Sequence, residues 1–344
     1  MAMMSNTVEK VLLAAPRGYC AGVDRAVQTV ERALEIHGPP VYVRKEIVHN
    51  KHVVERLRER GVIFVERETD VPEGSVCVFS AHGVAPSVYA NARARELRTI
   101  DATCPLVTKV HREALRFAED GYTIVLVGHD GHEEVEGTMG EAPERIVLVQ
   151  SEQDVDELEV EDPERIAYVT QTTLSVDETS SILARLKERF PSVVGPRTDD
   201  ICYATTNRQT AVKQLAGSCD LMLVIGSRNS SNSVRLVEVA RDCGTDAHLI
   251  DSASEVREEW LDGKRVVGIS SGASAPENLV GELVSYFRAR GVRDISEVDA
   301  IREDVRFMLP KQVREAIGSP PTPPTPPTPP TQPAPRPDGV VEVS

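Results

Sequence analysis

The chain has 344 residues, 40% of them hydrophobic and 27% charged, which is enough for two or three domains with a buried core. Its formal net charge of −15 argues against a nucleic-acid-binding protein, because phosphate contacts require clustered lysine and arginine. No apolar run approaches the roughly 18 residues of a membrane helix, and the run at 11–15 is too short for a signal peptide. We therefore expect a cytoplasmic protein without a nucleic-acid or membrane partner.

Three segments of the chain begin alike, each with a cysteine directly before an amphipathic helical pattern. The first pattern follows Cys20, the second follows Cys104, and the third follows Cys202. The second pattern starts with Pro105, and proline suits the first helical position because the N–H that it lacks would have no partner there. A glycine ends each of the three patterns: Gly38, Gly121 and Gly217.

The remainder of each segment also repeats. A strand follows each helix and opens into a polar loop, and the spacing from cysteine to loop is 29, 28 and 28 residues for the pairs Cys20–His49, Cys104–His132 and Cys202–Ser230. A second strand, an acidic helix and a third strand come next. The loops after the third strands carry residues at matching points: His82, Thr172 and Ser274.

This alternation of strands and helices predicts an α/β protein with parallel sheets. We expect three α/β units related by a pseudo-threefold axis, with the loops at the C-terminal ends of their strands meeting in the middle. The units span residues 21–104, residues 105–200, and residues 1–20 together with 201–317. The PPT repeats of 318–344 have little to bury and predict a disordered, proline-rich tail.

Six cysteines in a chain of this length do not indicate a disulfide scaffold. Three of them lie in strand-like or helix-end segments, where a structural role is expected: Cys77, Cys219 and Cys243. The other three are equivalent under the repeat. Three thiolates that meet at helix N-termini repel one another unless a metal ion or an iron–sulfur cluster lies between them.

The number and spacing of these ligands favour iron and sulfur over zinc. Zinc sites usually contain closely spaced C-x₂₋₄-C pairs, which are absent here. A 4Fe-4S cluster normally takes four cysteines, so three would leave one iron free to bind substrate. We therefore expect a central iron–sulfur cluster on Cys20, Cys104 and Cys202, and a non-catalytic zinc-binding module remains the alternative.

The polar loops supply the rest of a candidate site. Their neutral donors and one carboxylate are placed at helix N-termini, which suits a phosphate or diphosphate held by backbone amides, hydroxyls and imidazoles. Neither a Walker A sequence nor a G-x-G-x-x-G fingerprint opens any unit, so a nucleotide is less favoured. The candidate residues are His49, His82, His132, Glu134, Thr172, Ser230, Ser231, Asn232 and Ser274.

Nine motifs, in order from about Val11 to Met308, closely resemble the hydroxymethylbutenyl diphosphate reductase (IspH/LytB) family. Tyr19 stands where phenylalanine is commoner, and the proline-rich tail lies outside the shared pattern. The motifs are APRGYCAGVDRAV, EIVHN, FSAHGVAPSV, DATCPLVTKVH, GHEEVEGTMGE, TQTTLSVDET, DICYATTNRQ, GSRNSSNSVRL and SSGASAPENLV.

The resemblance implies the last enzyme of the methylerythritol phosphate route to isoprenoids. Such an enzyme converts (E)-4-hydroxy-3-methylbut-2-enyl diphosphate to isopentenyl and dimethylallyl diphosphates by a two-electron, two-proton reductive dehydroxylation. The resemblance also implies one 4Fe-4S cluster with three cysteine ligands and one open iron site, and a ferredoxin or flavodoxin as electron donor. A 4Fe-4S hydro-lyase, which also uses an open iron, stays as an alternative.

The resemblance implies a role for each candidate residue. The cluster ligands would be Cys20, Cys104 and Cys202. The diphosphate pocket would be formed by His49, His82, Ser230, Ser231, Asn232 and Ser274. The catalytic proton source would be Glu134, with His132 and Thr172 beside it around the substrate hydroxyl. Supporting positions would be Thr173, Thr205 and Asn207.

Overall fold

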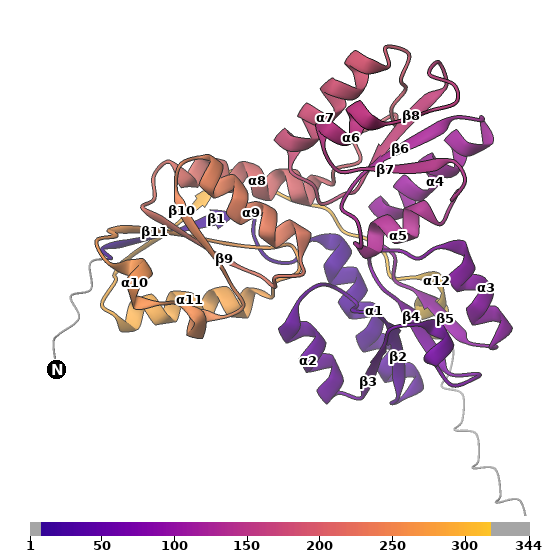
Figure 1. Ribbon diagram of the computed structural model, residues 1–344. Helices are drawn as coiled ribbons and strands as arrows, with labels where there is room; N and C mark the ends of the chain where they lie inside the picture. Colours follow the sequence, from indigo (N-terminus) through magenta and orange to yellow (C-terminus); the bar gives the residue numbers. More distant parts are fainter. Residues whose placement is uncertain (1–7, 318–344) are drawn as a thin grey trace, which may run out of the picture.

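The structure, a computed structural model, describes residues 8–317, and the predicted tail at 318–344 lies outside the described residues. Figure 1 shows three α/β lobes arranged around a common centre. Each lobe contains one parallel sheet, and these sheets have four, three and five strands in the order of the lobes. The predicted fold class, three α/β units with parallel sheets, is confirmed.

The first lobe has a sheet in the order β3-β2-β4-β5. Its strands are β2 (Val41–Arg44), β3 (Val62–Val65), β4 (Val76–Phe79) and β5 (Arg98–Asp101). Its helices are α1 (Ala21–His37), α2 (Lys51–Glu59), the short η1 (Glu68–Asp70) and α3 (Pro86–Ala94). The last described helix, α12 (Lys311–Ile317), returns to contact α1.

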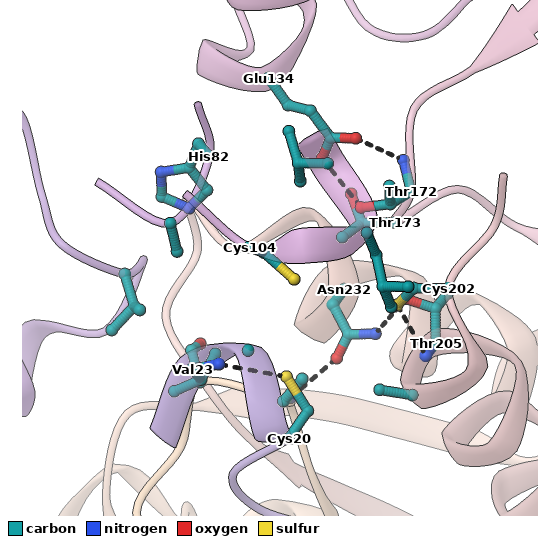
Figure 2. Close-up of a pocket in the computed structure, with 18 of the residues that line it drawn as sticks. Cys20, Val23, His82, Cys104, Glu134, Thr172, Thr173, Cys202, Thr205 and Asn232 are labelled. Atoms are coloured by element: carbon teal, nitrogen blue, oxygen red, sulfur yellow. Dashed lines mark hydrogen bonds between the residues drawn. The ribbon is translucent and has the colours of Figure 1, made fainter. Parts of the chain in front are cut away.

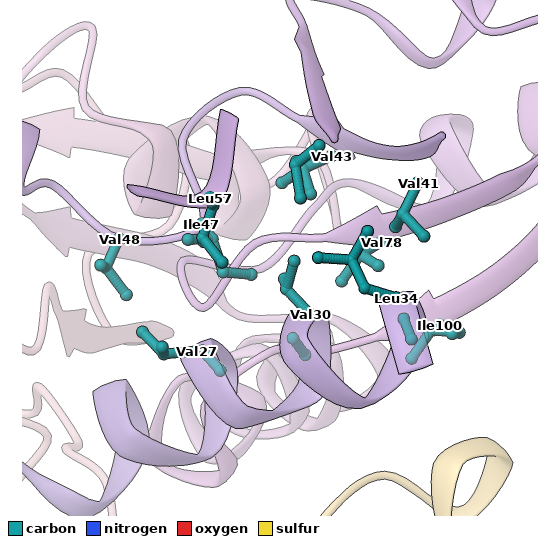
Figure 3. Close-up of a cluster of buried hydrophobic side chains, with 14 of the residues drawn as sticks. Val27, Val30, Leu34, Val41, Val43, Ile47, Val48, Leu57, Val78 and Ile100 are labelled. Carbon is teal, nitrogen blue, oxygen red and sulfur yellow. The ribbon is translucent and has the colours of Figure 1, made fainter. Parts of the chain in front are cut away.

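The core of this lobe explains the helical pattern after Cys20. Val27, Val30 and Leu34 recur along one face of α1 and are buried against the sheet, as Figure 3 shows. From the sheet, Val41, Val43 and Val78 contribute to the same cluster. Strand β4 is buried along its whole length, as expected for a parallel strand that is covered on both faces.

The second lobe has a sheet in the order β7-β6-β8. Its strands are β6 (Thr123–Val127), β7 (Ile146–Val149) and β8 (Ile166–Thr170). Its helices are α4 (Pro105–Glu119), α5 (Glu133–Met139), α6 (Glu152–Glu157) and α7 (Val176–Arg189).

The third lobe has a sheet in the order β10-β9-β11-β1-β12. Its strands are β1 (Lys10–Ala15), β9 (Leu221–Ile225), β10 (Asp246–Ile250), β11 (Val266–Ser271) and β12 (Asp294–Asp299). Its helices are α8 (Tyr203–Ala216), α9 (Ser231–Asp242), η2 (Ala253–Glu255), α10 (Glu258–Leu261) and α11 (Glu277–Ala289). The N-terminal strand β1 pairs in parallel with both β11 and β12.

The same strand order occurs in all three lobes, because the first strand after each cysteine-led helix lies between the next two. These triplets are β3-β2-β4, β7-β6-β8 and β10-β9-β11. Strands β1, β5 and β12 lie outside these triplets. The boundaries of the units at 21–104, 105–200, and 1–20 with 201–317 stay a prediction.

Two local features differ from the sequence-based expectation. The sequence PVYVRKEIV at 40–48 predicts one strand that reaches the loop at His49, but β2 ends at Arg44, because Lys45 adopts a left-handed backbone with φ of 54°. The segment after His132 was expected to be a polar loop but forms helix α5. Among the helices of residues 8–317, none is both long and apolar enough to cross a membrane.

Candidate active site

Each of the three equivalent cysteines is the N-cap residue of a helix: Cys20 of α1, Cys104 of α4 and Cys202 of α8. Backbone N–H groups of the first turn donate to two of the sulfurs. Val23 donates to Cys20 Sγ at 3.5 Å, and Thr205 donates to Cys202 Sγ at 3.3 Å. Because a helix N-terminus carries partial positive charge, all three positions favour a negatively charged sulfur.

The three sulfurs are directed into the same space from different lobes (Figure 2). Gly22 makes their approach possible, since a Cβ at this position would lie 2.7 Å from Cys104 Sγ and 3.8 Å from Cys20 Sγ. Burial, and then the neighbouring Cys20, raise the pKa of Cys104 to about 12 and that of Cys202 to about 11. Thiolates at these positions therefore need positive charge between them, and the donor set of three sulfurs fits an iron–sulfur cluster.

One cavity collects all the candidate residues from the three lobes. The residues proposed from the sequence that line it are Cys20, His49, His82, Cys104, His132, Glu134, Thr172, Cys202, Ser230, Ser231, Asn232 and Ser274. Thr173 and Thr205 line it as well. Asn207 is not among the lining residues, and its Nδ2 donates to Glu303 Oε1 at 3.1 Å.

Glu134 lies in the first turn of α5 and is only 2% exposed. The backbone N–H of Thr172 donates to its Oε1 at 2.7 Å, and the Thr172 hydroxyl donates to its Oε2 at 3.0 Å. Burial raises the pKa of Glu134 to about 7, although the two hydrogen bonds from Thr172 oppose the shift. A carboxyl group with this pKa can hold a proton near neutral pH and donate it into the cavity.

The adjacent Glu133 has the opposite character. Burial alone would raise its pKa, but the hydrogen bond with His82, together with the charges of His82, His49 and Lys45, lowers it to about 2. Glu133 is therefore ionised at neutral pH while Glu134 can be protonated. Two neighbouring carboxyl groups with pKa values this far apart are a common sign of an acid and a structural or electrostatic partner.

Hydrogen bonds join the loops around the cavity, both within the third lobe and between the third and first lobes. Asn232 Oδ1 accepts from the backbone N–H of Ala273 at 2.9 Å, and Asn232 Nδ2 donates to Thr205 Oγ1 at 3.3 Å. The Ser274 hydroxyl donates to the backbone carbonyl of His49 at 2.8 Å. Since the loops also lead into the N-termini of α2 and α9, the cavity wall combines hydroxyls with helix ends that favour a phosphate group.

Three histidines gather on one side of the cavity. His49 and His82 are stacked, with ring centroids 4.0 Å apart and ring planes 15° apart, and the ring of His132 stands edge-on 5.5 Å from His49. His49, His82 and Glu133 have ligand atoms within 4.8 Å of one another, which is close enough for a metal ion. However, the nitrogen lone pairs of stacked rings lie in separate parallel planes and do not converge on one point. The stacked pair is therefore better suited to a polyanion than to a metal ion.

Part of the cavity wall was not identified from the sequence. The apolar side chains are Val23, Val48, Leu106, Val107 and Phe307, together with the ring of Tyr203. Phe307 comes from the stretch between β12 and α12, which forms no regular element and so gives no periodic signal. An apolar wall beside a polar pocket suits a ligand with a short hydrocarbon part and an anionic end.

The comparisons with known proteins identify the family. A family model described as "LytB protein" matches residues 11–288. The chain belongs to the LytB family. The predicted resemblance is thereby confirmed.

Curated members of the LytB family include close relatives of this chain. The 4-hydroxy-3-methylbut-2-enyl diphosphate reductases of Nocardia farcinica and Leifsonia xyli are each 60% identical to it, over 90% of this chain and over 93% and 92% of the relatives. The solved reductase of Plasmodium falciparum is 37% identical with a TM-score of 0.87, over 90% of this chain and 98% of that one. A second solved reductase, described as the terminal enzyme of the non-mevalonate pathway, is 32% identical with a TM-score of 0.59, over 82% and 100%.

Proposed function

We propose that this member of the LytB family is a 4-hydroxy-3-methylbut-2-enyl diphosphate reductase, as its close relatives are named. In this reaction the allylic C–O bond breaks, two electrons and two protons enter, the oxygen leaves as water, and isopentenyl and dimethylallyl diphosphates form. The observation that carries the proposal is the single cavity in which three helix-capping cysteines, a buried protonatable glutamate and a polar diphosphate-type wall meet.

Cys20, Cys104 and Cys202 would hold one 4Fe-4S cluster, in keeping with the iron–sulfur chemistry of the family. When bound, such a cluster supplies electrons and one iron without a protein ligand, which can act as a Lewis acid toward an alcohol oxygen. The N–H groups of Val23 and Thr205 stabilise the negative charge of two of the sulfurs.

The diphosphate would bind to the polar wall of the cavity, and the hydrocarbon part of the substrate would lie against the apolar wall. Imidazoles, hydroxyls and an amide supply its donors: His49, His82, Ser230, Ser231, Asn232 and Ser274. Because these groups come from loops that hydrogen bonds hold together, they fix the position of the diphosphate and orient the allylic carbons. The apolar wall around Val107 and Phe307 excludes water from the reacting carbons.

Glu134 would deliver the protons. Its carboxyl group is buried, is held by Thr172 and has a pKa of about 7, so it can protonate the departing hydroxyl or the allylic carbon and then be reprotonated. Thr172 would relay the proton or orient the substrate hydroxyl. His132 caps α5 by accepting from the backbone N–H of Glu134 at 3.2 Å, which fixes the start of this helix beside the cavity.

The two electrons must come from a partner protein. The sequence carries no legible flavin or nicotinamide motif, and we therefore infer a ferredoxin or flavodoxin as the donor. We place the reaction in the cytoplasm, where such reduced donors are found.

The deciding experiment is anaerobic purification followed by a visible absorption spectrum and addition of substrate with a chemical reductant. We expect iron–sulfur absorption and consumption of two electrons for each diphosphate product formed. Product formation without consumption of reductant would identify a hydro-lyase. A colourless protein that contains zinc after anaerobic purification would identify a metal-binding module and refute the reductase.

A further inference from the structure

A carboxylate lies against the Nδ1 edge of each of the two stacked histidines. Glu133 Oε2 is 3.1 Å from His82 Nδ1, and Glu46 Oε2 is 3.3 Å from His49 Nδ1. Glu46 lies in the loop after β2, whereas Glu133 is the first residue of α5 in the second lobe. The two contacts are thus made by separate elements, and both imidazoles are mostly buried.

Neighbouring side chains hold both carboxylates in place. Asn229 Nδ2 donates to Glu46 Oε2 at 2.8 Å, and the Ser80 hydroxyl donates to Glu133 Oε2 at 3.4 Å. In both cases the accepting oxygen, Oε2, is the same carboxylate oxygen that lies next to the histidine Nδ1. Each carboxylate is therefore aimed at its imidazole and not left to sample other positions.

The two ring nitrogens of each histidine have different partners. His49 and His82 line the central cavity, and Glu46 and Glu133 line a neighbouring cavity that His49 also lines. Within residues 8–317, the hydrogen bonds of both rings run through Nδ1. The Nε2 edge of each ring is thus the one available to a ligand in the central cavity.

A neutral imidazole carries one N–H, so it can donate from one edge only. If Nδ1 donates to a carboxylate, Nε2 presents a lone pair, and a lone pair repels the oxygens of a diphosphate. A ring that lies between a carboxylate and a phosphate oxygen must therefore donate from both edges, which requires the imidazolium form.

We infer that Glu46 is a positioning residue that couples diphosphate binding to proton uptake by His49. The inference rests on the proposed function, since it takes the diphosphate pocket as the binding site. Glu46 orients the ring of His49 with Nε2 toward the ligand and stabilises the positive charge that the ring gains. The proton comes from solvent when the ligand binds and returns when the product leaves.

The unliganded pocket favours a neutral His49. Two imidazolium rings stacked 4.0 Å apart would repel each other, and burial followed by the charge of His82 lowers the pKa of His49, so His49 is neutral at pH 7. The negative charge of the diphosphate reverses this balance. Because protons are taken up, the affinity for diphosphate should rise as the pH falls. The other titratable groups around the two rings are Glu46, Glu133, His132, His129 and Lys45.

The test measures the protons that the cluster-containing enzyme takes up when it binds inorganic diphosphate, without reductant. Calorimetric titrations at one pH in buffers with different ionisation enthalpies give this number. Protons taken up or released by diphosphate itself cancel when each variant is compared with the wild type at the same pH. The variants are Glu46→Gln and His49→Gln. In Glu46→Gln the glutamine amide can donate to Nδ1 of His49, so a neutral ring can donate from Nε2 without an added proton. In His49→Gln the titrating ring is absent.

A matched control is Glu136→Gln. This substitution also removes one carboxylate, but the Glu136 side chain pairs with Lys45 at 2.8 Å and makes no hydrogen bond to a histidine within residues 8–317. We expect Glu46→Gln and His49→Gln each to take up about one proton fewer than the wild type. We expect Glu136→Gln to match the wild type.

Equal proton uptake by the wild type, Glu46→Gln and His49→Gln would overturn the inference, while reductase activity of the wild type would leave the proposed function in place. If inorganic diphosphate does not bind to the wild type at all, the diphosphate pocket itself is wrong. Iron content measured for every variant shows whether the fold and cluster survive. The two variants change different side chains, so loss of one to misfolding still leaves the other as a test.

Discussion

Replacing Glu134 by glutamine separates proton delivery from every other role of this side chain. Glutamine has nearly the same size. Its amide oxygen can still accept from the Thr172 N–H, which in the wild type donates to Glu134 Oε1 at 2.7 Å. Its amide nitrogen can donate to the Thr172 hydroxyl oxygen, which reverses the wild-type bond in which this hydroxyl donates to Glu134 Oε2 at 3.0 Å. The buried contacts are thus kept, and the transferable proton is lost. We expect kcat to fall by about 10²- to 10⁴-fold, equivalent to about 3–5 kcal/mol of transition-state stabilisation.

The pH dependence gives a second readout of the same group. Because burial raises the pKa of Glu134 to about 7, its acid form is present below this pH and is lost as the pH rises above it. The kcat of the wild type should therefore decline above about pH 7. The residual activity of Glu134→Gln should lack this decline, since glutamine does not titrate there.

The assay is anaerobic steady-state turnover with a reduced chemical donor, together with iron content and substrate affinity for each variant. Glu133→Gln is the informative neighbour, because Glu133 contacts His82 and should change KM more than kcat. Glu136→Gln should change neither. Near wild-type turnover by Glu134→Gln, or a loss explained by missing iron, would refute the assignment of Glu134 as the proton source.

Three further predictions concern the cluster and the tail. Serine substitutions should abolish cluster retention at the three helix caps (Cys20, Cys104 and Cys202) but not at the three other cysteines (Cys77, Cys219 and Cys243), and equal iron content in all six variants would contradict the ligand set. Gly22→Ala should reduce iron content without unfolding the first lobe, because the new Cβ would lie 2.7 Å from Cys104 Sγ, and a variant with full iron content would show that the sulfurs can shift. Deletion of 319–344 should leave activity and melting temperature nearly unchanged, because its PPT composition offers little apolar surface to bury, and a large fall in melting temperature would show that this segment docks.

The sequence by itself determined the features that depend on local patterns. Each helix could be predicted from a short segment, by its periodicity, by a proline at the first helical position of one helix, and by the cysteine before it. The structure agrees, since Cys20, Cys104 and Cys202 are the N-cap residues of their helices. The near-constant spacing of the segments was enough to predict three α/β units whose loops meet. Cavity-lining residues such as His82 and Ser274 followed from their position after the third strand of each unit.

Only the tertiary structure decided which neighbours these residues have. Glu133 and Glu134 are adjacent in sequence, yet one is ionised by contact with His82 and the other is buried against Thr172. The place of β12 beside β1, and of Phe307 in the cavity wall, likewise depends on segments far apart in the chain. Desolvation and partner charge arise when distant segments pack together, so the acid–base character of the site cannot be derived from local sequence.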